Sequence, residues 1–134
     1  MVSISSLFTY LGMPLVNQRW SWGASNDKCV VLRVWQDEVV KRQKAIIILQ
    51  EHPDLFNLPG YKERERHIKE IQAGKPCYLI MCEAKDPESD RRVIKNFNEK
   101  ELFVGGELLE IEEGIIAIAY KSRIAVSEFK ITHN

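Results

Sequence analysis

The side chains best suited to chemistry in this chain lie between Arg19 and Glu38, a stretch that contains all three tryptophans. Indole rings stack on flat ligands such as nucleobases, and guanidinium groups bind phosphate. Carboxylates accept hydrogen bonds from N–H groups at a base edge. The candidate binding residues are therefore the aromatic and charged members of this stretch: Arg19, Trp20, Trp22, Arg33, Trp35, Asp37 and Glu38.

A β-hairpin is predicted to position these residues. Residues 29–35 are rich in Val, Leu and Trp, which favour strands, and residues 25–28 are turn formers. With those four residues as the loop, Trp20 lies opposite Arg33 and could stack on it. Alternation along the two strands then places all three indoles and Arg33 on one face, with small and aliphatic residues on the other.

This indole face has two interpretations, and the sequence leaves both open. Large aromatic side chains commonly fill the interior of a small barrel, in which case the face is core. Alternatively, part of the face lines a pocket in which the indoles stack on a planar ligand. Arg19, Arg33, Asp37 and Glu38 would then lie at the rim of that pocket.

A second pattern resembles a nuclease motif. Pro53-Asp54 and Glu83-Ala84-Lys85 have the spacing of PD…ExK nucleases, in which carboxylates hold a divalent cation and the lysine helps to activate water. The second half follows an apolar strand as that motif requires, whereas Asp54 falls in an irregular loop. The sequence contains no complete zinc, phosphate-loop or catalytic-triad motif. We therefore expect no cofactor, no metal ligand and no catalytic residue.

Composition limits the class of protein. A chain of 134 residues, 45% hydrophobic and 28% charged, is expected to form a single globular domain over residues 1–134. Its formal net charge of zero argues against a protein that coats nucleic acid by charge alone. We see no apolar run of membrane-spanning length and no secretory signal pattern. Three cysteines without a pair motif predict reduced thiols and a cytoplasmic location.

The clearest predicted helix spans about residues 61–73, with Gly74 just past its end. Its charged run, residues 62–66, is predicted to be a solvated face, with contact of its basic members to phosphate as the alternative. His67 is predicted to be a surface residue. A short N-terminal helix, capped by Ser3 or Ser5, is predicted to end before Gly12.

Most of the remaining chain has the composition of strands. Residues 45–49 and 77–82 are nearly continuous apolar runs and are predicted to be buried strands. Further strands are predicted at 101–104, 107–111, 115–120 and 123–131. The expected fold is α+β: a mostly antiparallel curved sheet or a small mixed β-barrel, with one main helix and a short N-terminal helix.

Part of the sequence resembles a set of small uncharacterised bacterial proteins through the pattern RWSWGA…LRVWQDE…PGYKER, residues 19–24, 32–38 and 59–64. That resemblance implies no particular activity. The order of helix, Gly74, Lys75, strand and β-rich remainder is more loosely similar to the ASCH and PUA-like barrels, which bind RNA or modified bases. The ASCH signature Gly-x-Lys-x-x-Glu-x-Arg is absent after this helix, so the resemblance implies a fold and a ligand class but no binding residues.

The leading hypothesis is a non-enzymatic binding module for a nucleobase-containing ligand or nucleic acid. Arg19 and Arg33 would meet phosphate, and Asp37 or Glu38 a base edge. One alternative is a protein–protein interaction or accessory protein of a mobile element, and another is a PD…ExK-like metal-dependent nuclease. We expect nucleic acid or a nucleotide as the partner and no membrane, and we leave a homo-oligomer open.

Overall fold

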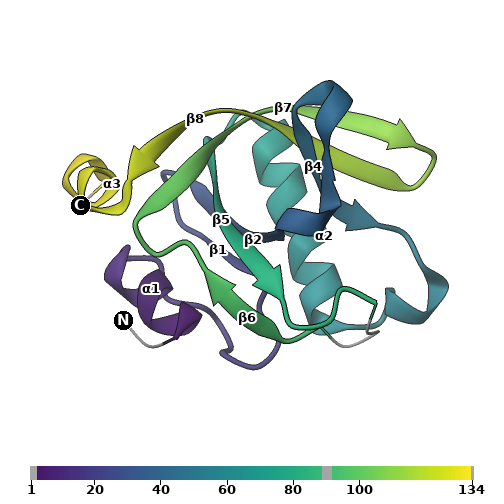
Figure 1. The fold of residues 1–134 in the computed structure, drawn as a ribbon, viewed down its shortest axis with the longest axis horizontal. Helices are drawn as coiled ribbons and strands as arrows, with labels where there is room; N and C mark the ends of the chain where they lie inside the picture. Colours follow the sequence, from purple (N-terminus) through teal and green to yellow (C-terminus); the bar gives the residue numbers. More distant parts are fainter. Residues whose placement is uncertain (1–2, 89–91, 134) are drawn as a thin grey trace.

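The computed structural model describes residues 3–88 and 92–133 (Figure 1). Over these residues the chain forms an eight-stranded sheet and three α-helices, which confirms the predicted α+β class. The helices are α1 (Ile4–Tyr10), α2 (Pro59–Gln72) and α3 (Val126–His133). The strands are β1 (Gly23–Ser25), β2 (Val30–Trp35), β3 (Val39–Val40), β4 (Ala45–Gln50), β5 (Cys77–Ala84), β6 (Ile94–Phe97), β7 (Glu101–Glu112) and β8 (Ile115–Ala125).

The sheet is curved and open. Its strand order is β1-β2-β5-β7-β8-β4-β3, and β6 also pairs with β5. Every pair is antiparallel except β2 with β5, which run parallel. The predicted antiparallel curved sheet is therefore confirmed, and the predicted alternative of a closed barrel is wrong. Closure would need a ladder between β2 and β4, which approach each other without pairing.

The sheet separates two apolar cores. One lies toward α1 and α3 and includes the fully buried rings of Phe8 and Phe129. The other lies toward α2 and includes Tyr61. Strand alternation sends Val31 to the first core and Leu32 to the second. Each fully buried side chain of this size contributes roughly 1.5–3 kcal/mol. Figure 1 shows α1 and α3 at one end of the molecule, where both chain ends lie, and α2 packed on the sheet away from them.

The C-terminal half differs from the prediction in how its strands are divided. The predicted breaks at residues 105–106 and 121–122 lie inside β7 and β8, which form one long hairpin with register shifts near the glycines. The strand predicted for residues 123–131 ends at Ala125, where α3 begins. Val126 and Phe129, three residues apart, both enter the first core, so burial of one helical face decides the structure there.

Helix α2 confirms the predicted main helix, but its buried face is partly polar. Gly74 follows it at φ 107°, and its N–H donates to the carbonyl of an earlier turn at 3.0 Å. Glu63, Arg64 and His67 are 2%, 5% and 7% exposed. The predictions of a solvated face for the first two and a surface position for His67 are therefore wrong. These residues occupy the same helical stripe as Ile68 and Ile71, which faces the concave side of the sheet.

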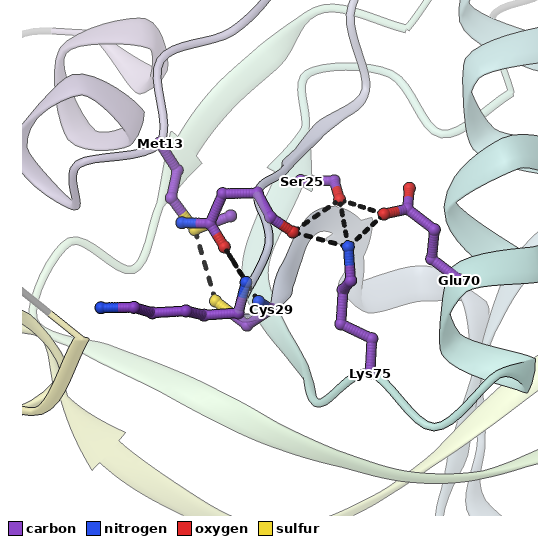
Figure 2. A network of polar contacts seen from close by, with 7 residues as sticks. Met13, Ser25, Cys29, Glu70 and Lys75 are labelled. Atoms are coloured by element: carbon purple, nitrogen blue, oxygen red, sulfur yellow. Dashed lines mark hydrogen bonds and ion pairs between the residues drawn. The ribbon is translucent and has the colours of Figure 1, made fainter.

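A polar network fixes the end of α2 to the hairpin loop (Figure 2). The ammonium of Lys75 contacts the carboxylate of Glu70 and donates to the carbonyl of Asn26 at 2.6 Å. The hydroxyl of Ser25 donates to the same carboxylate at 2.6 Å. Burial opposes ionisation of Glu70, but these donors outweigh it and lower the pKa of Glu70. The loop and the helix are thereby held in one arrangement.

We predict that buried His67 makes the free energy of unfolding decrease as the pH falls. Burial, and then the charge of Arg64, lower the pKa of His67 to about 4 in the folded chain. Between about pH 6.5 and 4 the unfolded chain therefore binds a proton that the folded chain excludes, so stability falls as the pH falls. The loss reaches about 3 kcal/mol below pH 4, at 1.36 kcal/mol per pKa unit.

The check is urea unfolding of the wild type and of His67→Leu between pH 7 and pH 4. The variant should lose about 3 kcal/mol less than the wild type across this range. His52→Leu, at an exposed histidine, is the matched control and should follow the wild-type curve. Parallel curves for His67→Leu and the wild type would contradict the prediction.

Candidate functional site

The predicted hairpin exists, but its register differs by two residues. Ser25 pairs with Val30, so the loop is residues 26–29 rather than 25–28. The side-chain carbonyl of Asn26 accepts hydrogen bonds from the two amides that precede β2, at 2.8 and 2.9 Å. Asn26 therefore starts the turn, as its side chain favours, and Ser25 is left to extend the strand.

This register changes the neighbours of the indoles. The amide of Arg33 donates to the carbonyl of Trp22 at 3.0 Å, so Trp22, and not Trp20, lies beside Arg33. The indole of Trp22 packs against the α2-side core, whereas that of Trp35 packs against the α1-side core. The prediction that three indoles share one face is wrong, because Trp20 and Trp22 precede the ladder and strict alternation does not extend to them.

A pocket of about 430 Å³ opens where β2 and β4 approach each other. The ladder of β3 with β4 stops at Ile46, and the ladder of β1 with β2 stops at Leu32. Beyond these points no described strand pairs with the facing sides of β2 and β4, and we call this gap the seam. Five of the seven predicted binding residues line the seam pocket: Arg19, Trp22, Arg33, Trp35 and Glu38. Trp20 and Asp37 do not line it.

Arg64, from α2, bridges the seam. Its Nη1 donates to the carbonyl of Ile48 in β4 at 2.6 Å. Its Nη2 donates to the carbonyls of Trp22 at 3.0 Å and Arg33 at 2.9 Å. Ile48 is the extra residue of a β-bulge between β4 and β8, which turns its carbonyl away from β8. The guanidinium also lies 5.8 Å from the centroid of the Trp22 ring.

The neighbours of Arg64 on α2 hold Trp22 in place. Glu63 accepts from the hydroxyl of Ser21 at 3.1 Å and from the amide of Trp22 at 3.3 Å. A Cβ atom on Gly60 would lie 2.5 Å from the Trp22 ring, so only glycine permits this approach of helix and indole. Burial raises the pKa of Glu63, while burial and the nearby Arg33 lower the pKa of Arg64 to about 10. Arg64 remains a cation at neutral pH.

The rim of the pocket is fixed by Arg92, from the segment before β6. Arg92 makes a bidentate pair with Asp37, with both N–O distances 2.7 Å, and lies 3.6 Å from Glu38. Its guanidinium is 5.4 Å from the centroid of the Trp35 ring. Asp37 is therefore committed to Arg92. Burial raises the pKa of Glu38 despite the opposing charge of Arg92.

Arg33 is a partly buried cation of the pocket whose guanidinium has a ring neighbour but no hydrogen-bond or ion-pair partner among the described residues. Its guanidinium lies 5.9 Å from the centroid of the Trp35 ring, whereas the sequence predicted stacking on Trp20. Among residues 3–88 and 92–133, no side-chain hydrogen bond or ion pair engages it. Burial lowers the pKa of Arg33, which marks a partly desolvated charge. Such a group gains most from an anionic ligand.

The carboxylates of the nuclease-like pattern have other partners. Asp54 lies 3.6 Å from the imidazole of His52, and Glu83 accepts from the side chain of Asn96 at 2.8 Å. In the described part of the chain, no group of three or more His, Cys, Asp and Glu side chains could hold a metal ion. No helix in that part is long and apolar enough to cross a membrane.

Four residues that build the pocket are not among the predicted binding residues: Tyr61, Glu63, Arg64 and Arg92. The first three had a signal, because they share a helical phase with Ile68 and Ile71. Arg92 had none, since its pairing with Asp37 joins positions 55 residues apart.

We predict that Arg64→Met lowers the free energy of unfolding by about 2–4 kcal/mol, because three backbone carbonyls lose a charged donor at a seam that has no ladder. Arg66→Met, on the exposed face of the same helix, is the matched control and should change it by less than about 0.5 kcal/mol. Chemical denaturation of both variants checks this. Equal free energies of unfolding for Arg64→Met and the wild type would show that the seam does not depend on Arg64.

Comparison of the chain with protein-family models, with curated proteins and with solved structures found no match.

Proposed function

We propose that the protein is a non-enzymatic binding module for a nucleobase-containing ligand, either a nucleotide or nucleic acid, and that the seam pocket is its binding site. The observation that carries this proposal is the convergence in one pocket of two indoles, Trp22 and Trp35, with the guanidinium of Arg33, which has no hydrogen-bond or ion-pair partner among the described residues. A planar anion is the ligand that this combination of groups complements.

The size and charge of the pocket support the same ligand class. A volume of about 430 Å³ falls within the range of roughly 300–1,000 Å³ common for small-ligand sites. The described lining contains four arginines and one glutamate, Arg19, Arg33, Arg64, Arg92 and Glu38, in a chain of zero net charge. Positive charge gathered in a cleft attracts an anion locally without making the whole surface basic.

The five predicted binding residues that line the pocket each have a role in this proposal. Trp22 and Trp35 supply stacking surfaces, worth about 1–3 kcal/mol per base. Arg33, with the exposed Arg19, meets phosphate, and Glu38 meets the base edge. Asp37 acts on the ligand only through Arg92, which it holds. The expectations of a mobile-element role and of a homo-oligomer stay predictions.

Tryptophan fluorescence tests the proposal. We expect single-stranded RNA, single-stranded DNA or nucleoside monophosphates to quench the wild-type emission in a saturable titration. Trp35→Leu should weaken binding roughly 5- to 150-fold, the equivalent of about 1–3 kcal/mol. Trp20→Leu is the matched control, since Trp20 does not line the pocket, and its affinity should stay within about twofold of wild type.

Circular dichroism establishes that each variant is folded before its affinity is compared. Flat titrations of the wild type with RNA, DNA and mononucleotides would overturn the proposal. An equal loss of affinity in Trp20→Leu and Trp35→Leu would show that binding occurs elsewhere.

A further inference from the structure

Glu38 is the only carboxylate among the described residues that line the seam pocket. It ends the 3₁₀ turn Gln36–Glu38 that directly follows β2, so the strand carrying Arg33 and Trp35 also sets its position. Its side chain is 25% exposed, enough to reach a ligand and buried enough to be partly desolvated. A carboxylate in this setting favours a ligand that brings hydrogen-bond donors.

The acceptor capacity of Glu38 is largely unused. Arg92 lies 3.6 Å away, beyond hydrogen-bond length, because its guanidinium is committed to Asp37 at 2.7 Å. No hydrogen bond to Glu38 occurs within residues 3–88 and 92–133. Besides the exposed Arg19, the pocket therefore presents two partly buried charged groups whose hydrogen-bonding capacity is unused among the described residues, the guanidinium of Arg33 and the carboxylate of Glu38.

These two groups specify different parts of a nucleotide. The guanidinium requires an anion, which a phosphate supplies and a nucleoside lacks. The carboxylate accepts only, so it favours a base edge that bears N–H donors and repels one that presents carbonyl oxygens. Guanine carries two neighbouring donors on one edge, the ring N1–H and the exocyclic amino group, and their spacing suits the two oxygens of a carboxylate. Uracil has a single ring N–H between two carbonyls.

We infer that the seam pocket takes a guanine nucleotide, with Arg33 binding the phosphate and Glu38 selecting the base. This inference rests on the proposed function and deepens it by naming the ligand and the residue that determines specificity. The shared chemistry is a guanine base with an adjacent phosphate, which a free mononucleotide or the 5′ end of a single-stranded oligonucleotide can supply.

Calorimetric titration with four ligands tests the inference in the full-length wild type. Guanosine 5′-monophosphate should bind at least 10-fold more tightly than inosine 5′-monophosphate, which lacks only the exocyclic amino group. It should also bind at least 10-fold more tightly than guanosine, which lacks only the phosphate, and than uridine 5′-monophosphate. Tenfold corresponds to about 1.4 kcal/mol, close to the lower end of the range of about 1.5–3 kcal/mol for one charged hydrogen bond.

Two variants assign the two preferences. Glu38→Gln should bring the affinities for the guanine and inosine monophosphates within about threefold of each other and leave the preference for phosphate intact. Arg33→Gln should bring the affinities for guanosine 5′-monophosphate and guanosine within about threefold of each other and leave the preference for guanine over inosine intact. Glu65→Gln, an exposed acid on the far face of α2, is the matched control and should keep both preferences. Loss of both preferences in either variant would overturn the separate roles.

A further titrant distinguishes a free nucleotide from a nucleic-acid end as the source of the ligand. It is a single-stranded oligonucleotide with a 5′-phosphorylated guanine, and its 5′-hydroxyl form is the control for the phosphate. Tighter binding of the phosphorylated form than of the mononucleotide identifies a nucleic-acid end, and the opposite order identifies the free nucleotide; both support the inference. Equal binding of all four small ligands would overturn it and leave the proposed function standing. Absence of binding by every titrant would overturn both.

Discussion

The hydrogen bonds of Arg64 are the constraint on which both the sheet and the pocket depend. A sheet this curved brings β2 and β4 close together, and their backbone groups then need partners. A ladder would satisfy them and close the barrel, but it would also fill the gap. Arg64 instead supplies donors to carbonyls on both sides. One planar side chain with several fixed donors spans a gap that a second strand would have closed.

Burying a cation here has a cost that the geometry offsets only in part. An unpaired guanidinium in the protein interior would lose several kcal/mol of hydration. Arg64 regains part of this through three carbonyl acceptors, the π-face of Trp22 and the negative charge of Glu63 nearby, but its pKa still falls to about 10. Residues of α2 also restrain Trp22. Its amide donates a hydrogen bond to Glu63, and its ring fits against the helix because residue 60 is glycine. Arg64, which bridges the seam, thus also orients Trp22 at one wall of the pocket.

Much of the fold followed from local patterns, and the failures have physical causes. Apolar runs located β4 and β5, and Gly74 located the end of α2. The charged run of α2 was predicted to be solvated because its side chains are charged. Its position on the helix is the better guide, since charged side chains on the buried face are accommodated when hydrogen-bond partners are present. The hairpin register failed because Asn26 and Ser25 are both turn formers, and only the network around Lys75 and Glu70 favours one arrangement.

The candidate site shows the same division between local and distant information. Five of its residues were found because they lie within one stretch of twenty positions, residues 19–38. Their individual roles could not be predicted, because these depend on which side chains distant in sequence form ion pairs with them. Arg33 and Arg92 both lie within 6 Å of the Trp35 ring centroid, yet Asp37 neutralises only Arg92. A paired arginine stiffens the rim, whereas an unpaired one retains its donors for a ligand. What separates a structural cation from a candidate binding cation here is the position of one carboxylate, and only the folded chain brings that carboxylate to its partner.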